Sequence, residues 1–510
     1  MANAGPPSDR GGGHKSLGTA STPSQQPPLT TGVHEPYHQK EIMGIGPERE
    51  IEISRENRAS RIIWTDSAGK KRNLVVLPTV YPPREDTTML HRALCKIKGA
   101  PGKMLEIGTG SGAIGTSMAE IGWKVCGIDI NPLAIASARG NHQNSGIFET
   151  IEISVEEIGK DFEKSWDVIT WNTPYLDSPI TDEDRLGPFE EASLSWEGKH
   201  PVRRLLDIAS IPGMLSKNGC IIALVSTSND TNYELSKAIS EGWSIRTIET
   251  KSNGGERTAV IALWKGWKWE PHFEKSVSST MEFFTDDFQV GNCIISDEQT
   301  AGYGRKKSPW VSVNGDLTGT WRITGPESPN LDIQSIHMAA SLAIFNAICT
   351  WKGKVFQSTT WTNTSSNNYS IKWPNDIFCS TTKTKIAGIL LEAQSKGNEI
   401  WISCGIGINS TPRIVEGEMI GGVSETGLEG LEKHVHIHLS SWFENHHRVP
   451  DVDNNFLHRR WWNVASSSHI IGKNKKYNNQ PCVISRLLHS QVQIYSKNGK
   501  TDLSGIEIED

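Results

Sequence analysis

The chain has 510 residues, of which 36% are hydrophobic and 22% charged, and its formal net charge at pH 7 is -6. A single hydrophobic core seldom grows beyond about 250–300 residues, so this length predicts several domains. The acidic balance gives no electrostatic basis for a dedicated nucleic-acid-binding protein. We expect no membrane helix, since no apolar run approaches the ~20 residues needed, and no signal peptide, since residues 1–35 lack an apolar segment. The eight scattered cysteines form no C-x-x-C pair, which predicts a reduced, cytoplasmic protein without structural zinc.

The N-terminal region begins with a segment that cannot offset its own ordering entropy. Residues 1–38 are rich in Gly, Pro, Ser, Thr and Gln, which predicts disorder. Short alternating runs then predict a small β element at 50–53, 61–64 and 74–77. From about 85 to 265, strands alternate with helical stretches, and the strands are expected at 104–107, 125–129, 166–171 and 220–225. That alternation predicts an α/β fold with a mostly parallel, doubly wound sheet.

The C-terminal region has a different pattern. Residues 272–465 mix strands and helices, and apolar residues at helical spacing predict a helix over 331–351. Alternation at 492–495 before a turn predicts a small β-rich cap. The expected segments are a disordered N-terminus at 1–38, an α/β domain at 39–265, an α+β domain at 272–465 and a small β-rich domain at 468–510.

A glycine-rich turn follows the strand predicted at 104–107. Gly108, Gly110 and Gly112 would let the backbone approach a ligand closely. Asp129 ends the next strand, where a carboxylate can bind a ribose diol. This pattern alone fits NAD as well as S-adenosylmethionine, and a tight turn without a ligand is the plainer alternative.

A second motif, Asn172-Thr173-Pro174-Tyr175, directly follows the strand at 166–171 and favours S-adenosylmethionine. An amide nitrogen is a poor nucleophile, so an enzyme that methylates one must hold its NH2 group with acceptors and aim it at the methyl donor. Asn172 offers a side-chain oxygen, and Tyr175 can pack on a flat target group. Alone, the motif could also be a strand-end turn.

From Val80 to about Trp264 the chain resembles the HemK-like glutamine methyltransferases, above all the branch that acts on class 1 release factors. The matching stretches are 80–87, 106–112, 127–132 and 172–176. The resemblance implies a Rossmann-like class I methyltransferase fold and methyl transfer to the glutamine of a Gly-Gly-Gln motif. It implies that S-adenosylmethionine is bound by Thr87, Glu106, Gly108, Thr109, Gly110, Gly112, Asp129 and Asn172. For the methyl acceptor it implies Asn172, Thr173, Pro174 and Tyr175, with Asn172 and Tyr175 as the catalytic pair.

Two positions depart from this family. Thr173 stands where the family usually has Pro, and Glu156 is the candidate for the acidic residue near the adenine. Related Asn-Pro-Pro-Tyr enzymes methylate the exocyclic amine of adenine, so an adenine-directed nucleic-acid methyltransferase stays the alternative. Relatives often need a small zinc-binding activator protein, which the resemblance implies as a partner.

The C-terminal region carries a further set of ordered motifs: a glycine- and lysine-rich loop at 302–307, Lys-Trp-Pro-Asn-Asp at 372–376, Lys-Ile-Ala-Gly at 385–388 and Gly-Ile-Gly-Ile-Asn at 405–409. Each alone could be a turn or a solvated basic loop. Joining a carboxylate to an amine through ATP brings negatively charged reactants together, which calls for Lys, Arg, backbone amides and a ligand for Mg²⁺.

This order of motifs resembles the biotin protein ligases. The resemblance implies ATP-dependent biotinylation, through biotinyl-AMP, of a lysine on a biotin carboxyl carrier protein. It assigns catalysis to Lys385 and Arg305 and makes Asp376 the candidate ligand for Mg²⁺. It implies that biotin and ATP are bound by Ser279, Thr280, Gln299, Gly302, Tyr303, Gly304, Arg305, Trp310, Asn375, Asp376, Lys385, Gly388 and Asn409. Residues 468–510 resemble the SH3-like domain that ends many biotin ligases.

Departures in this second region leave alternatives open. Ser278, Met281, Tyr303 and Ser308 differ from the family's pattern. A ligase region that binds biotin or its carrier without turnover, or one that uses another acyl group such as lipoate, therefore stays possible. No winged-helix segment is evident, so specific DNA binding is not expected. His434, His436 and His438 form a conspicuous run, but zinc would need further ligands, and we do not assign them a metal.

Overall fold

The computed structural model describes residues 59–142, 146–159, 161–174, 198–253, 256–285, 287–326, 328, 331–353, 368–372, 376–397, 399–465, 474–477, 480–487, 492–503 and 508–509. All of these belong to one compact unit, residues 44–510. The predicted disorder of 1–38 and the strand expected at 50–53 lie outside the described residues. We call residues 59–265 the N-terminal half and residues 272–509 the C-terminal half.

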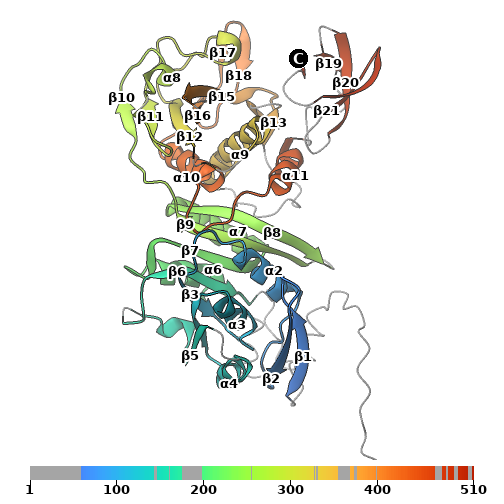
Figure 1. Cartoon of the computed structure of the whole chain (residues 1–510). Coiled ribbons are helices and arrows are strands. Elements are labelled where there is room, and N and C mark those ends of the chain that lie inside the picture. Colours follow the sequence, from blue (N-terminus) through green and yellow to red (C-terminus); the bar gives the residue numbers. More distant parts are fainter. Residues whose placement is uncertain are drawn as a thin grey trace, which may run out of the picture. The chain divides into compact units, whose positions relative to one another are not determined.

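The N-terminal half is built around a seven-stranded sheet (Figure 1). Its elements are β1 (Ser60–Thr65), β2 (Lys71–Val76), α2 (Glu85–Leu94), β3 (Lys103–Ile107), α3 (Ala113–Glu120), β4 (Lys124–Asp129), α4 (Pro132–Asn141), β5 (Ile147–Glu152), η1 (Val155–Glu157), β6 (Trp166–Asn172), α6 (Pro201–Ala209), β7 (Leu215–Ser226), α7 (Asn229–Ser240), β8 (Trp243–Asn253) and β9 (Glu256–Lys265). The strand order is β5-β4-β3-β6-β7-β9-β8. The strands β5, β4, β3, β6 and β7 run parallel, while β9 and β8 are antiparallel. The predicted, mostly parallel sheet is confirmed.

Both faces of this sheet are covered, because successive residues of a strand point to opposite faces. Ile221 and Ala223 of β7 pack in one apolar cluster with α6 and α7. Cys220 and Ile222 pack in another cluster with α2 and α3. Continuously apolar strands such as β7 are typical of a sheet that is buried on both sides. The small β element predicted from the sequence is the hairpin of β1 and β2.

The C-terminal half contains a second seven-stranded sheet of a different kind. Its elements are β10 (His272–Glu274), α8 (Thr280–Phe283), β11 (Cys293–Ser296), η2 (Arg305–Lys307), β12 (Leu317–Thr324), α9 (Ile333–Trp351), β13 (Tyr369–Lys372), β14 (Asp376–Cys379), β15 (Lys385–Lys396), β16 (Glu399–Ile408), β17 (Arg413–Val415), β18 (Glu418–Ile420), α10 (Leu431–Phe443) and α11 (Asn454–Ala465). The order is β10-β11-β12-β16-β15-β14-β13, and every pair except β10 with β11 is antiparallel.

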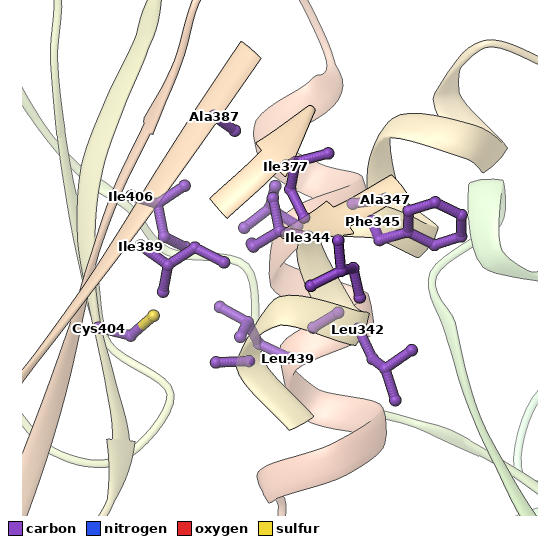
Figure 2. Close-up of a cluster of buried hydrophobic side chains, with 14 of the residues drawn as sticks. Leu342, Ile344, Phe345, Ala347, Ile377, Ala387, Ile389, Cys404, Ile406 and Leu439 are labelled. Atoms are coloured by element: carbon purple, nitrogen blue, oxygen red, sulfur yellow. The ribbon is translucent and has the colours of Figure 1, made fainter. Parts of the chain in front are cut away.

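The core of this half lies between its sheet and the helices α9 and α10. Leu342, Ile344 and Ala347 of α9 belong to one buried cluster with Ile389 and Ile406 of the sheet and Leu439 of α10 (Figure 2). The helix begins where the sequence pattern places it, because the Asp332 side chain accepts a hydrogen bond from the Ser335 backbone N–H at 2.7 Å.

The helix α9 corrects one sequence expectation. It has 19 residues and a mean hydropathy of 1.3, so by length and composition it could cross a membrane. The expectation that no apolar run approaches that length is therefore wrong. However, 83% of the apolar window is buried inside the fold, which is what a core helix requires.

The end of the chain is β-rich, as predicted. The strands are β19 (Asn474–Tyr477), β20 (Gln480–Leu487), β21 (Val492–Ser496), β22 (Gly499–Leu503) and β23 (Ile508–Glu509). They form an antiparallel sheet in the order β22-β21-β20-β19-β23. The likeness of this part to an SH3 domain stays a prediction.

Candidate active sites

The first candidate site lies at the carboxyl ends of β3, β4 and β6, where ligands commonly bind in parallel sheets. Gly108, Gly110 and Gly112 have φ angles of 62°, 55° and 73°, in the left-handed region that glycine adopts without strain. A methyl group on Gly112 would lie 2.8 Å from the Cα of Ala138 in α4. Conformation and packing therefore both require glycine in this loop.

Asp129, at the end of β4, is held against the glycine loop. Its carboxylate accepts hydrogen bonds from the backbone N–H groups of Gly110 and Asn131, each at 2.9 Å. Burial raises the pKa of Asp129, and these two amides partly offset that rise. The carboxylate is thus fixed in position, and its remaining lone pairs fit the diol of a ribose.

Glu106 lies beneath the same loop. Its side chain is buried and accepts a hydrogen bond from the hydroxyl of Thr109 at 2.7 Å. Burial raises the pKa of Glu106 to about 8. Both Glu106 and Thr109 therefore support the shape of the loop from inside the fold.

Asn172, the last residue of β6, has a fixed amide orientation. Its Nδ2 donates to the Asp86 carboxylate of α2 at 2.8 Å. A carboxylate only accepts hydrogen bonds, so Nδ2 must face Asp86 and Oδ1 must face the other way. That Oδ1 atom is buried and has no hydrogen-bond partner among the residues that the structure describes. A buried, unpaired acceptor at the end of β6 is suited to bind the N–H of a substrate amide.

The neighbouring hydroxyl groups are used by the fold. Thr87 accepts from the Arg84 backbone N–H at 3.1 Å at the start of α2. Thr173 donates its hydroxyl to the Leu224 carbonyl of β7 at 2.8 Å, so this departure from Pro anchors the turn to the sheet. Pro174 is buried. Tyr175 lies outside the described residues.

The second candidate site lies on β14, β15 and β16. Lys385 Nζ lies 3.0 Å from Asp376 Oδ1 and 5.5 Å from the centre of the Trp310 ring. Asn409, which directly follows β16, donates through Nδ2 to the Lys385 carbonyl at 3.3 Å. The strand order thus brings together residues that are far apart in the chain.

Two glycines make room for the Trp310 ring. A methyl group on Gly407 would lie 2.3 Å from that ring, and one on Gly388 would lie 2.9 Å from it and 3.2 Å from Lys385 Nζ. The indole Nε1 of Trp310 is buried without a hydrogen-bond partner in the described part of the chain. The indole therefore forms a wall of the site beside the lysine.

The basic loop before Trp310 has a defined backbone. Trp310 N–H donates to the Gly302 carbonyl at 2.9 Å, and Gly304 N–H donates to the Ser308 carbonyl at 2.7 Å. Lys307 lies 3.4 Å above the centre of the Tyr303 ring. The Arg305 side chain is exposed at the tip of this loop, where it can reach an anionic ligand.

Polar residues on either side of β11 form a compact group with Thr320 of β12. Thr280 donates its N–H and its hydroxyl to Gln299 Oε1, at 2.8 and 3.0 Å. Thr320 of β12 donates to the Thr280 hydroxyl at 2.9 Å, and the Ser279 hydroxyl accepts from the Met281 N–H at the start of α8. Met281 packs against Gly405, where a methyl group would lie 2.8 Å from its sulfur.

Comparison with known proteins matches the two halves of the chain to two different families. Residues 99–242 match a family described as "Methyltransferase domain", and residues 273–409 match the "Biotin/lipoate A/B protein ligase family". The chain carries a methyltransferase domain and a biotin/lipoate ligase domain. Its homologues are protein glutamine methyltransferases and biotin ligases.

Individual relatives each match one part. A Methanocaldococcus jannaschii chain named as a protein N5-glutamine methyltransferase is 28% identical over 37% of this chain and 93% of its own length. Biotin–protein ligase 2 of Arabidopsis thaliana is 30% identical over 28% of this chain, a match that spans 39% of that ligase. A biotin protein ligase structure from Aquifex aeolicus covers 48% of this chain and 98% of its own, at 19% identity and a TM-score of 0.36.

Several residues of the two domains were missed by sequence reasoning or lie differently from what it suggested. Asp86 was missed, although it adjoins Thr87 in the stretch that resembles the methyltransferases. In the ligase domain, Arg413 pairs with Asp316 at 2.5 Å and also donates to Asn409 at 3.3 Å. Glu156 pairs with Arg204, and its side chain is 56% exposed. Asn375 lies outside the described residues.

Asp376 is the metal ligand that the sequence suggests. Within the described ranges no group of three or more His, Cys, Asp or Glu side chains could hold a metal ion. His434, His436 and His438 lie on the helix α10. The carboxylate of Asp376 is already paired with Lys385, so its role toward Mg²⁺ stays a prediction.

Proposed function

We propose that this chain is a bifunctional enzyme that methylates a protein glutamine side chain and biotinylates a lysine of a carrier protein. The observation that carries the first activity is the buried Asn172 Oδ1, which has no hydrogen-bond partner in the described part of the chain and stands at the end of β6, next to the strand β3 that leads into the glycine loop. The second activity rests on Lys385, which is paired with Asp376 beside the wall formed by Trp310.

In the methyltransferase domain, S-adenosylmethionine would supply an electrophilic methyl group. Asp129 would bind its ribose, and the glycines of the loop would let it lie against the backbone. Asn172 Oδ1 would accept a hydrogen bond from the NH2 group of the target glutamine and turn the nitrogen toward the methyl donor. Asp86 would keep the Asn172 amide in the orientation that this contact requires, and Tyr175 would pack on the target amide.

The proposed acceptor is the glutamine of a Gly-Gly-Gln motif in a translation release factor. The similarity of residues 80–264 to glutamine methyltransferases supports this choice, and a small zinc-binding activator is a proposed partner. An adenine amine in nucleic acid is the competing acceptor. Transfer of labelled methyl groups, measured in parallel on release factor, RNA and DNA, would decide between them, and methylation of nucleic acid alone would refute the protein acceptor.

In the ligase domain, biotin and ATP would be joined to form biotinyl-AMP with release of pyrophosphate. A lysine amine of a biotin carboxyl carrier domain would then displace AMP and form the amide. Lys385 and Arg305 would stabilise negative charge on the reacting carboxylate and phosphate. Asn375 and Asp376 would orient the adenylate, with Asp376 as the proposed Mg²⁺ ligand. Ser279, Thr280 and Gln299 would bind the polar ring of biotin.

Pyrophosphate exchange into ATP would test the ligase directly. We expect exchange that depends on biotin, and exchange driven by lipoate instead would identify a different acyl group. Binding of biotin without any exchange would refute turnover. All eight cysteines are free thiols, which supports the proposal that the enzyme works in the cytoplasm.

A further inference from the structure

The histidine-bearing helix α10 of the ligase domain lies against the methyltransferase sheet. The hydroxyls of Ser244 in β8 and Ser440 in α10 are 2.8 Å apart, and the Ile245 N–H donates to the Ser441 hydroxyl at 3.0 Å. Ser244 and Ser440 are both 0% exposed. A methyl group on Gly266, which follows β9, would lie 2.2 Å from the Ser244 hydroxyl and 2.3 Å from the Ser440 hydroxyl. These two elements are thus in close contact.

Arg246 of β8 is the centre of this contact. Its side chain is buried and donates to the carbonyls of Ser441, Glu444 and Pro450, at 3.0, 3.0 and 2.9 Å. The last carbonyls of a helix have no partner within the helix and need donors from elsewhere. Here the Arg246 guanidinium, about 200 residues away in the chain, donates to the carbonyls at the carboxyl end of α10. The helix dipole favours a positive charge at that end.

A half-buried acid, Glu444, accompanies this buried arginine. The Glu444 carboxylate accepts from Trp264 Nε1 at 2.9 Å and from the Ser440 hydroxyl at 2.5 Å. Burial lowers the pKa of Arg246 to about 10 and raises the pKa of Glu444, while each charge partly offsets the shift of the other. Separating the domains would leave each of these groups without its partner or would require water to replace it.

The contact extends to the amino end of the methyltransferase sheet. Arg448 lies 3.4 Å from Asp167 near the start of β6, and Lys98 Nζ lies 2.9 Å from Asp451. The glycine loop and Asn172 are at the opposite, carboxyl ends of the strands. The ligase domain therefore contacts the edge and the amino end of the sheet, away from the candidate methylation site.

The histidine run is used in this same region. His434 lies 3.4 Å from the Ser240 hydroxyl of α7, and His436 lies 3.0 Å from the Trp267 carbonyl of the interdomain segment. His438 faces into its own domain, 3.0 Å from the Thr350 hydroxyl. Packing and hydrogen bonding thus account for a motif that otherwise suggests a metal.

We propose that Ser244–Arg246 of β8, Trp264 of β9 and the segment 266–269 form a permanent interface with residues 431–451 of the ligase domain, so that the two domains stay bound even when the chain between them is cut. We call these residues the domain interface. This inference does not depend on either proposed activity. It identifies the partner of the β8 edge as the ligase domain of the same chain.

Cleavage of the full-length protein would test it. A protease site inserted after Glu270 keeps Trp267 and Trp269, which pack on His436, on the first fragment. After cleavage, sedimentation over a dilution series would measure the affinity of the two fragments. We expect the fragments to sediment as one particle at micromolar concentration. Arg246→Met should weaken their association at least ~30-fold, the range for truncating a buried, hydrogen-bonded charge at an interface.

The control is Arg257→Met, which changes an exposed arginine of the same sheet and should leave the affinity unchanged. Gly266→Val keeps every hydrogen-bonding group and forces the two serines apart, so it should also weaken association, and it decides the matter if the Arg246 variant does not fold. Separation of the unaltered fragments at micromolar concentration would overturn the proposal. Equal affinity of the Gly266→Val and unaltered fragments would overturn it as well.

Discussion

Replacing Asp86 with Ala should lower kcat for methyl transfer while the affinity for S-adenosylmethionine changes little. Asp86 is a positioning residue: it accepts from Asn172 Nδ2 at 2.8 Å and so turns Oδ1 toward the acceptor site. Hydrogen bonds to charged groups contribute about 1.5–3 kcal/mol. If that whole contribution is lost in the transition state, kcat falls about 10- to 150-fold, since each 1.36 kcal/mol is a factor of ten.

The assay is single-turnover methyl transfer to a release factor, with binding of S-adenosylmethionine measured separately by calorimetry. The unaltered enzyme, Asp86→Ala, Asn172→Ala and the double variant form a thermodynamic cycle. Because Asp86 is expected to act through Asn172, its replacement should cost almost nothing once Asn172 is absent. Tyr81→Phe is the matched control, since it removes a 3.2 Å hydrogen bond to the same carboxylate and keeps both partners of the Asp86–Asn172 contact. Additive losses in the cycle would refute the reasoning.

Three further changes test other parts of the account. Gly407→Ala should destabilise the ligase domain by about 1–3 kcal/mol through its clash with Trp310 and reduce biotin transfer. Thermal unfolding would measure this, with Gly140→Ala, at an open helical position, as a control that loses no stability. The pKa of Glu106 is raised to about 8 from 4.5, so the folded state keeps a proton that the unfolded state releases. The free energy of unfolding should therefore fall as pH rises from about 5 to 8. Chemical denaturation of Glu106→Gln at several pH values should lack this contribution to the fall. If the pH dependence of the variant equals that of the unaltered protein, the assigned burial is contradicted. Lys385→Met should reduce biotin transfer at least ~100-fold without affecting methyl transfer, and retained ligase activity would exclude the proposed role.

Much of the fold follows from local sequence patterns. The strand at Cys220–Val225 was predicted from a continuous apolar run, and it lies inside β7 because both faces of that strand are covered. The helix predicted over 331–351 is α9, Ile333–Trp351. Periodicity identifies such elements because burial on a sheet or helix face repeats with the geometry of the element.

Other features depend on contacts that no local pattern encodes. Asp86 and Asn172 are 86 residues apart, so only the folded chain brings their side chains together. The role of Thr173 depends on the adjacent carbonyl of β7. Arg246 looks like an ordinary polar residue of an edge strand, and its burial follows only from the presence of α10 beside it. Each of these features is a long-range polar contact between elements that the sequence predicts separately.

The most direct test of the central claim is mass spectrometry on one reaction that contains the protein, S-adenosylmethionine, biotin, MgATP, a release factor and a biotin carrier domain. The account predicts a methyl group on the Gly-Gly-Gln glutamine and biotin on the carrier lysine. It further predicts that Asn172→Ala removes only the methyl mark and that Lys385→Met removes only the biotin mark. An unmodified carrier, with a control ligase active in the same mixture, would contradict the assignment of the ligase domain. An unmethylated release factor, with the zinc-binding activator present, would contradict the proposed acceptor.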